Sequence, residues 1–368
     1  MKVMSVFGTR PEAIKMCPLV RVLQKTEGIE SIVCVTGQHR QMLDQVLEVF
    51  DVHPEYDLNI MKERQTLASI TASVVDGIGN VIDQCRPDIV LVHGDTTTSF
   101  AAALGAFYRQ TAVGHVEAGL RTYNKYSPYP EEMNRVLTGH IADFHFAPTL
   151  RNREALAREG VTKHVYVTGN TVIDAFATTV KDNYRFKSPE LNEVDFSKRT
   201  ILLTAHRREN LGAPLEQICD AVLAICEQVP DVQFVYPVHL NPAVRETVFA
   251  KLGNHDRIRL IDPLDVQDMH NAMARCFLVM TDSGGLQEEA PHLGKPVLVL
   301  RTETERPEAV EAGTARVVGV CTDDIVRNAM ELLTCEESYR RMATAQNPYG
   351  DGHASERIAR ILLEQCNG

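Results

Sequence analysis

The sequence lacks the features of a membrane protein, a nucleic-acid-binding protein or a disulfide-stabilised protein. Its longest unbroken aliphatic run, residues 221–226, has six residues, whereas a membrane-spanning helix needs about 20. Positive charge is not in excess, because 38 Lys and Arg stand against 49 Asp and Glu, a net charge of −11. Such a surface does not attract a phosphate backbone, so we expect neither a membrane nor a nucleic acid as a partner.

Sequence signatures of redox, metal and cofactor sites are also missing. The nine cysteines form no C-x-x-C pair, their number is odd, and several lie in apolar stretches such as residues 32–35. This usage is typical of reduced, buried side chains and predicts a cytoplasmic protein. The first residues lack the long apolar core of a signal peptide. Since no zinc spacing, G-x-G-x-x-G or Walker A motif occurs, we expect no metal and no NAD or other cofactor.

What is present is a regular alternation of short β-rich runs and helical stretches. Several of the runs, such as residues 89–92 and 297–300, are continuous Val, Ile and Leu, which is typical of strands buried on both faces of a parallel sheet. The expected strands are residues 3–7, 31–35, 88–92, 112–116, 144–147 and 165–168, then 200–204, 233–237, 258–261, 277–281, 297–300 and 315–319. The clearest amphipathic helices are residues 13–24, 67–83, 99–109, 215–227 and 325–333. This alternation predicts doubly wound α/β domains.

The length of 368 residues suggests two domains or three small ones. A polar stretch without a strand signal, residues 182–199, follows a helix near residues 173–181, so we place a hinge at 169–199. We expect two Rossmann-like doubly wound parallel-sheet domains facing a cleft. The predicted domains are residues 1–169 with a returning helix in 354–368, and residues 170–353.

In such sheets the ligand binds beyond the carboxyl ends of the strands, and charged motifs follow strands throughout the first half. Residues 8–12 (GTRPE) begin a helix. The free N–H groups at its N-terminus, together with Arg10 and Lys15, could bind an anion. A capped helix start with two surface cations is an equal alternative. Asp95 and His93 place a carboxylate and an imidazole together at the end of the buried strand 88–92. The alternative for Asp95 is a helix N-cap.

Two further motifs of the first half carry carboxylates. Glu117 ends a strand beside Gly119, which implies a close approach to the backbone; the alternative is a salt bridge to Arg121. Residues 130–135 (PEEMNR) open a helix with Glu131 and Glu132, which favour its positive end. Glu131 and Arg135 are four residues apart and share a helix face.

The second half offers groups that suit a diphosphate. Its first strand is followed by His206, Arg207 and Arg208. Their charge-assisted donors favour phosphate or substrate binding, and the alternative is an inter-domain salt-bridge patch. Residues 283–285 (SGG) let backbone N–H groups approach a pyrophosphate, and Glu288 or Glu289 could accept ribose hydroxyls. With Arg301 and Arg306 after the next strand, the two halves together describe a site for a nucleotide-sugar.

Seven motifs in this order resemble those of the bacterial non-hydrolysing UDP-N-acetylglucosamine 2-epimerases, over essentially the whole chain. They are residues 8–12 (GTRPE), 93–97 (HGDTT), 114–121 (GHVEAGLR), 130–132 (PEE), 206–209 (HRRE), 237–242 (PVHLNP) and 283–289 (SGGLQEE). The resemblance implies a GT-B architecture, a homodimer, no metal or NAD, and interconversion of UDP-N-acetylglucosamine and UDP-N-acetylmannosamine for surface polysaccharide synthesis.

The resemblance also implies roles for individual residues. Those expected to hold UDP are Arg10, His206, Ser283, Gly284, Gly285, Glu289 and Arg306. Those expected to line the reacting sugar are Lys15, Asp95, Glu117, Glu131 and Arg135. Members of the family are activated by a second UDP-N-acetylglucosamine, and the matching allosteric positions are Gln38, Gln41, Arg64, Glu131, Arg207 and His239. Met269 departs from the pattern, because relatives often carry an aromatic there, and His270 beside it reads as a helix-surface residue.

The family's chemistry expels UDP from C1 as the C2 proton leaves, because no adjacent carbonyl acidifies that proton. The 2-acetamidoglucal that forms takes UDP back after protonation of the opposite face. We expect Asp95 and Glu117 to transfer protons, Glu131 to position the sugar, and His206 to assist catalysis at the diphosphate. A hydrolysing epimerase and a GT-B glycosyltransferase remain alternatives. A UDP-sugar sensor is disfavoured because all three carboxylates are present, and an NAD oxidoreductase because the glycine fingerprint is missing.

Overall fold

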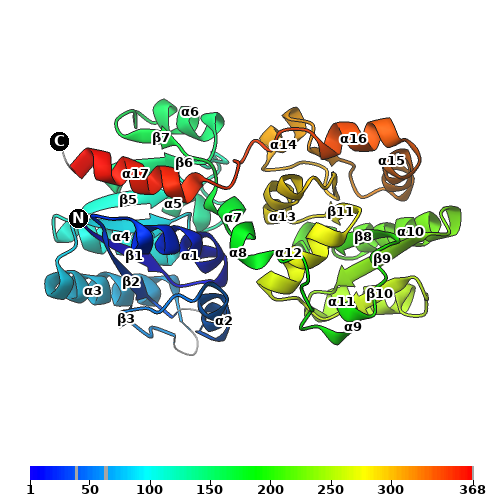
Figure 1. The fold of residues 1–368 in the computed structure, drawn as a ribbon, viewed down its shortest axis with the longest axis horizontal. Coiled ribbons are helices and arrows are strands. Elements are labelled where there is room, and N and C mark those ends of the chain that lie inside the picture. Colours follow the sequence, from blue (N-terminus) through cyan, green and yellow to red (C-terminus); the bar gives the residue numbers. More distant parts are fainter. Residues whose placement is uncertain (38–39, 62–64, 367–368) are drawn as a thin grey trace. The chain divides into compact units, whose positions relative to one another are not determined.

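Each half of the chain forms a parallel β-sheet flanked by helices (Figure 1). The computed structural model describes residues 1–37, 40–61 and 65–366, which divide into two units. Unit 1 comprises Met1–Thr178 and Tyr349–Gly368, and unit 2 comprises Thr179–Pro348. All twelve strands expected from the sequence are present, which confirms two Rossmann-like parallel-sheet domains.

Unit 1 contains seven parallel strands in the order β3-β2-β1-β4-β5-β6-β7. Its strands are β1 (Lys2–Phe7), β2 (Glu30–Val35), β3 (Tyr56–Asp57), β4 (Ile89–His93), β5 (Ala112–Val116), β6 (Phe144–Ala147) and β7 (Val165–Val167). Its helices are α1 (Arg10–Lys25), α2 (Arg40–Phe50), α3 (Leu67–Cys85), α4 (Thr97–Tyr108), α5 (Glu131–Ile141), α6 (Leu150–Arg158), α7 (Thr171–Asp174) and α17 (Ala354–Cys366), with α8 (Phe176–Thr179) at the unit boundary. The two-residue strand β3 was not predicted.

Unit 2 contains six parallel strands in the order β10-β9-β8-β11-β12-β13. They are β8 (Arg199–Thr204), β9 (Val232–Pro237), β10 (Ile258–Ile261), β11 (Leu278–Thr281), β12 (Val297–Val299) and β13 (Ala315–Val317). The α-helices are α9 (Pro189–Asn192), α10 (Ala213–Gln228), α11 (Pro242–Leu252), α12 (Val266–Arg275), α13 (Gly284–Glu289), α14 (Pro307–Glu311), α15 (Thr322–Thr334) and α16 (Glu336–Ala343), with 3-10 turns η1 (Arg208–Asn210) and η2 (Ala290–Leu293).

The central strands are apolar on both faces because each sheet lies between two helical layers. Successive side chains of a strand point to opposite faces, so alternate residues of β1 enter two different clusters. Val3 and Phe7 pack in a cluster with α1, α2 and α17. Met4 and Val6 pack in a second cluster with α3 and α4. This explains why the strands read as continuous rather than alternating apolar runs.

The unit boundary differs from the predicted domain boundary by a few residues. Residues 170–178 and 349–353, expected in the second domain, lie with unit 1. Asp174 is the physical reason, because its carboxylate accepts hydrogen bonds from the backbone N–H of Ala354 at 3.1 Å and of Ser355 at 2.6 Å. Asn170 N–H also donates to the Tyr349 carbonyl at 2.7 Å. These contacts tie α7 and the start of α17 to the same unit.

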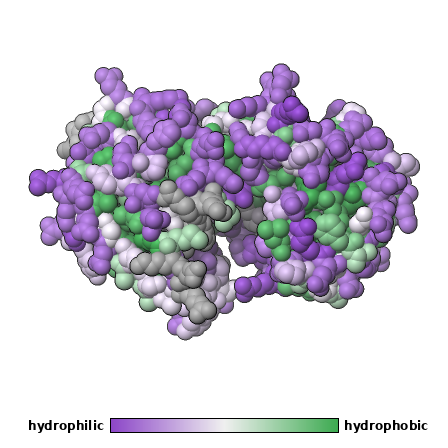
Figure 2. Space-filling view, turned by 90° about the horizontal axis from the view of Figure 1, so that it is seen from below, coloured by the Kyte–Doolittle hydropathy of each residue, from purple (hydrophilic) through white to green (hydrophobic). Residues whose placement is uncertain are grey.

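Surface hydropathy and the state of the cysteines are two further features of the described residues. No helix within the described ranges is both long and apolar enough to span a membrane, and the face in Figure 2 is mostly hydrophilic with smaller hydrophobic areas. The cysteines whose side chains the structure describes are free thiols.

Candidate active site

The strand order of each sheet reverses at one point, and the charged motifs follow the strands at these two points. In unit 1 the reversal lies between β1 and β4, whose following residues include Arg10 and Asp95. In unit 2 it lies between β8 and β11, which are followed by His206 and Ser283. In doubly wound folds a crevice for ligands opens at this reversal, outside the carboxyl ends of the strands.

A cavity of about 450 Å³ opens in unit 1 beside its reversal point. It is lined by Thr9, Arg10, Pro11, Met42, Asp95, Thr96, Thr97, Pro130, Glu131 and Asn134. Three predicted site residues, Arg10, Asp95 and Glu131, thus share one cavity. A guanidinium and two carboxylates around such a volume suit a polar ligand that carries a negative group.

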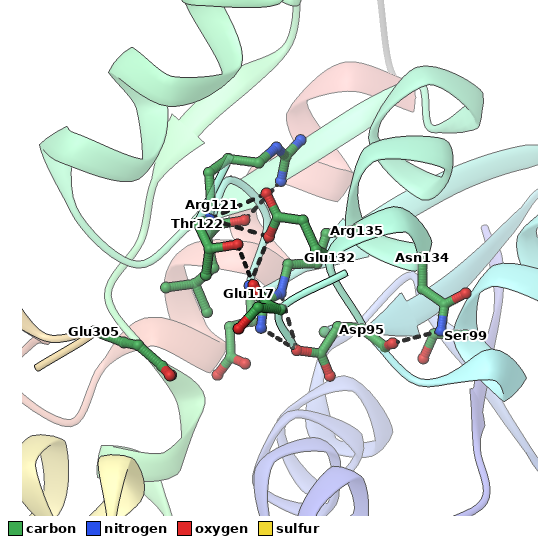
Figure 3. A network of polar contacts seen from close by, with 12 residues as sticks. Asp95, Ser99, Glu117, Arg121, Thr122, Glu132, Asn134, Arg135 and Glu305 are labelled. Carbon is green, nitrogen blue, oxygen red and sulfur yellow. Dashed lines mark hydrogen bonds and ion pairs between the residues drawn. The ribbon is translucent and has the colours of Figure 1, made fainter. Parts of the chain in front are cut away.

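Arg135 lies between two carboxylates (Figure 3). Its Nη2 and Nε donate to Asp95 Oδ2 at 2.7 and 3.0 Å, and its Nη1 donates to Glu132 Oε2 at 3.0 Å. Asn134 Nδ2 also donates to the Asp95 carbonyl at 2.9 Å. Asp95 is therefore fixed by an ion pair; the N-cap of α4 is its neighbour Thr96. The helix-face partner of Arg135 is Glu132 rather than Glu131, which leaves Glu131 on the cavity wall.

Glu117 is a buried carboxylate on a strained backbone. Its φ of 62° lies in the left-handed region that a non-glycine residue rarely adopts, and such strain clusters at functional sites. Its Oε2 accepts hydrogen bonds from Lys15 Nζ and, at 2.9 Å, from Asn170 Nδ2, while His93 Nε2 lies 3.7 Å away. Four side chains, from β4, α1 and the segments after β5 and β7, thus converge on one point.

The charge state of Glu117 follows from these contacts. Burial by itself raises the pKa of the Glu117 carboxyl, but the Lys15 ammonium and the His93 ring more than offset burial. The pKa of Glu117 therefore lies well below its usual range, and the group is a carboxylate at neutral pH. The loop of Asp95 passes beside it, because a Cβ added at Gly94 would lie 3.5 Å from Glu117 Oε1.

In unit 2, His206 is held by Asp282 and His239. Asp282 Oδ2 accepts from the backbone N–H of His206 at 2.7 Å, and Asp282 Oδ1 lies 3.5 Å from His206 Nδ1. The His239 ring stacks on His206 with centroids 5.2 Å apart and planes 9° apart. Burial lowers the pKa of His206, Asp282 opposes that shift, and His239 and Arg207 add to it.

Two guanidinium groups flank the glycines that follow β11. A Cβ added at Gly284 would lie 3.8 Å from both Arg207 Nη2 and Arg306 Cζ. Arg306 Nε donates to the buried Glu288 carboxylate, which fixes that guanidinium. Ser283 precedes α13 and makes no side-chain cap hydrogen bond with it. The Ser283–Gly285 segment, Arg207 and Arg306 thus lie together, as the sequence motifs suggested.

Three residues lie differently from what the sequence suggested. The salt bridge from Glu117 to Arg121, the alternative to a functional role of Glu117, does not form, because Arg121 pairs with Glu159 through two contacts of 2.8 Å. Gly119 does permit a close approach, but of the protein itself: a Cβ there would lie 2.3 Å from the Asn152 carbonyl oxygen.

His270 is not on the helix surface but 2% exposed. Its Nδ1 lies 2.7 Å from Thr179 Oγ1, and its Nε2 lies 3.6 Å from Glu289. Glu289, expected to hold UDP, thus lies beside an imidazole that precedes it by 19 residues, with His270 on α12 and Glu289 at the end of α13. The expected allosteric residues Gln38 and Arg64 lie outside the described residues, as does the side chain of Gln41.

Sequence reasoning gave no role to His93, Asn170 or Asp282. His93 is the last residue of β4 and Asp282 directly follows β11, one within and the other directly before a motif described above. Their position at the carboxyl end of a strand could therefore have indicated a role. Asn170 had none, because its contact with Glu117 spans 53 residues. Across residues 1–37, 40–61 and 65–366, no group of three or more His, Cys, Asp or Glu side chains could hold a metal ion.

Comparison with known proteins identifies relatives over nearly the whole chain. The family model described as UDP-N-acetylglucosamine 2-epimerase matches residues 21–363. A Bacillus subtilis UDP-N-acetylglucosamine 2-epimerase is 58% identical over 364 residues, which is 99% of this chain and 95% of the relative. The fold matches a Neisseria meningitidis UDP-GlcNAc 2-epimerase solved with UDP-GlcNAc, with a TM-score of 0.89, 47% identity, and coverage of 99% of this chain and 100% of that one. A Staphylococcus aureus MnaA–UDP co-structure matches with a TM-score of 0.89, 50% identity, and coverage of 100% and 97%.

Proposed function

Because the chain belongs to the UDP-N-acetylglucosamine 2-epimerase family and is therefore an epimerase, we propose that it interconverts UDP-N-acetylglucosamine and UDP-N-acetylmannosamine by eliminating UDP and adding it back. The observation that carries the proposal is the ionised Glu117 between Lys15, Asn170 and His93, with the Asp95 loop beside it. A neighbouring solved relative is described as bound to UDP-GlcNAc, which makes this nucleotide-sugar the expected substrate.

The proposed route makes one demand on the carboxylates. The C2 proton must leave toward a base, and a proton must return on the opposite face of the glucal. We assign the accepting role to Glu117 because it is ionised at neutral pH and so has a free acceptor oxygen for the proton. Asp95, fixed by Arg135, is the second proton-transfer group, and Glu131 on the cavity wall positions the sugar. Since the reaction is reversible, the group that accepts a proton in one direction gives it back in the other.

The route makes a second demand on the leaving group. Negative charge grows on the diphosphate as the C1–O bond breaks, so donors fixed in advance lower the barrier most. In unit 1, Arg10 lines the cavity. In unit 2, His206 and Arg207 follow β8, and Arg207 and Arg306 lie beside Gly284, which follows β11. We assign UDP to these groups with Ser283, Gly284, Gly285 and Glu289, and the reacting sugar to unit 1 residues including Lys15.

Activation by a second UDP-N-acetylglucosamine is part of the proposal. Of the positions assigned to it, Arg207 lies near Gly284 and His239 stacks on His206. An effector that contacts these two side chains would therefore touch the groups assigned to the diphosphate. We also propose a cytoplasmic homodimer that supplies a precursor of surface polysaccharide.

Proton NMR of the EDTA-treated protein with UDP-N-acetylglucosamine in D₂O tests the function. We expect UDP-N-acetylmannosamine with deuterium at C2 and little free UDP. Accumulation of UDP and N-acetylmannosamine would instead identify a hydrolysing epimerase. An unchanged substrate would reject the epimerase and favour a GT-B glycosyltransferase. Size-exclusion chromatography with light scattering tests the dimer, and a rate that rises cooperatively with substrate concentration would support activation.

A further inference from the structure

The carboxylate of Asp282 is buried, and only one of its two oxygens is hydrogen-bonded. The residue is 0% exposed and follows β11. Oδ2 accepts three hydrogen bonds, from the backbone N–H of His206 at 2.7 Å, that of Arg207 at 2.8 Å and Asn210 Nδ2 at 3.0 Å. Oδ1 has no hydrogen-bond partner in the part of the chain that the structure describes. A buried charged oxygen without a partner is costly and calls for an explanation.

The atom that faces this oxygen is His206 Nδ1, at 3.5 Å. The three donors on Oδ2 prevent the carboxyl group from turning, so Oδ1 stays directed at the ring. The stacked His239 ring restricts the rotation of His206. A carboxylate is only an acceptor, so the neutral ring should carry its proton on Nδ1, which leaves Nε2 on the other side of the ring.

We propose that Asp282 is a positioning residue for His206, fixing the ring so that Nδ1–H faces the buried carboxylate and Nε2 is presented to a phosphate group. The inference rests on the proposed function, since it assigns His206 to the leaving diphosphate. When that phosphate approaches, Nε2 takes up a proton from solvent and becomes a charged donor, and the adjacent carboxylate stabilises the resulting imidazolium. Asp282 acts only through His206.

The charged and titratable groups that act on His206 are few. Asp282 follows β11, His239 follows β9, and Arg207 is the next residue along the chain. Asp282 favours the protonated ring, whereas His239 and Arg207 disfavour it. A negative phosphate would add to the effect of Asp282. Removal of the Asp282 charge therefore lowers the pKa of His206, and removal of its acceptor changes the tautomer.

The variant Asp282→Asn separates these effects from folding. The three donors on Oδ2 require an oxygen there, so the amide NH₂ of the variant must face His206 Nδ1. Nδ1 then becomes an acceptor, and the proton moves to Nε2. The matched control is Asp268→Asn, because Asp268 is 2% exposed in the same unit and accepts backbone N–H bonds from Lys187 and Ser188 without contacting His206.

The experiment is ¹⁵N NMR of histidine-labelled protein, with His206 assigned by a His206→Gln variant. In the wild type we expect a neutral ring protonated on Nδ1. In Asp282→Asn we expect the Nε2–H tautomer, a lower pKa of His206, and a fall in kcat of about 100-fold, the lower end of an acid–base contribution, with a smaller change in KM. Asp268→Asn should leave the His206 signals and kcat unchanged while lowering the urea midpoint.

Two results would overturn the inference. One is a wild-type ring protonated on Nε2, which needs no variant and so does not depend on the folding of one. The other is a folded Asp282→Asn protein whose His206 signals and kcat match the wild type. The NMR signals are recorded without substrate. Failure of the wild type to epimerise would therefore reject the proposed function, while the tautomer would still decide the geometry.

Discussion

The hydroxyl of Thr96 donates a hydrogen bond to Glu12 Oε1 at 2.6 Å, across 84 residues of chain. Ser99 Oγ donates to the same oxygen at 2.9 Å, and the other oxygen of Glu12 accepts from the N–H groups of Gly8 and Thr9. Glu12 thus ties the start of α1 to the start of α4. Since Arg10 and Asp95 are neighbours of the joined residues, this contact fixes their separation across the cavity.

The first prediction concerns this contact. Glu12→Ala should lower the free energy of unfolding by about 3 kcal/mol, because three buried donors and the partly buried Thr96 hydroxyl lose their acceptor. Glu12→Gln should cost less, since the Thr96 and Ser99 hydroxyls can rotate to accept from the new amide. Urea denaturation measures the free energy of unfolding of both variants. The control is Glu27→Ala, at an exposed position after α1, whose free energy of unfolding should stay within about 0.5 kcal/mol of wild type. Equal loss in the two Glu12 variants would contradict this account.

The second prediction concerns the charge of Glu117. Its pKa is lower in the folded than in the unfolded chain, so its contribution to stability is present above about pH 4.3 and is lost as the pH falls through the folded value. Lys15→Met removes the nearest positive charge and should raise the pKa of Glu117. The acid limb of the kcat profile should then move to higher pH, with kcat reduced at neutral pH.

The matched control for Lys15 is Lys25→Met, at the exposed last residue of the same helix. It removes the same charge at a position away from Glu117 and should leave the profile unchanged. A wild-type profile in Lys15→Met would show that Lys15 does not govern the ionisation of Glu117.

The third prediction separates the roles of the cavity carboxylates. Asp95→Asn should lower kcat by about 10²–10⁴-fold, the range for a positioned acid–base group. Glu131→Gln should lower it less and raise KM, because Glu131 is assigned to positioning. Deuterium incorporation at C2, followed by NMR, measures the proton step directly. The control is Asp83→Asn, which removes the surface ion pair with Arg109 and should leave kcat unchanged. A larger fall in kcat in Glu131→Gln than in Asp95→Asn would reverse the assignment.

The fourth prediction concerns stability in mild acid. Burial lowers the pKa of His115 to about 3 and that of His145 to about 4. The unfolded chain, with histidine pKa values near about 6.5, therefore binds more protons below that pH. Stability should rise with pH between about 4 and 6.5, by an amount on the order of 3 kcal/mol for each ring. His115→Gln should flatten this dependence in urea denaturation at several pH values.

His140→Gln is the control for that experiment, because His140 lies on the exposed part of α5 in the same unit. It should leave the slope of stability against pH as in the wild type. A wild-type slope in His115→Gln would show that the buried ring does not set it.

The sequence by itself determined the parallel strands and the places where charge collects. A strand with a continuous apolar run, such as residues 89–92, buries all its side chains only when helices cover both faces of the sheet. Residues that directly follow a parallel strand must lie at the carboxyl edge of the sheet. Both are local properties, so Arg10, Asp95 and His206 could be expected near ligand-binding edges, and the motif order indicated the family. The strand β3, with two residues, is too short to leave such a pattern.

The tertiary structure decided which side chains meet. The sequence suggested only Arg121 as a salt-bridge partner of Glu117, and packing instead brought Lys15, Asn170 and His93 to it. The tertiary structure also paired Arg121 with Glu159 and buried His270. It placed the Asp282 carboxylate against His206. An ion pair or hydrogen bond forms only within a few ångströms, and the approach of residues far apart in the chain is set by how both layers of helices pack on a sheet, which no local pattern encodes.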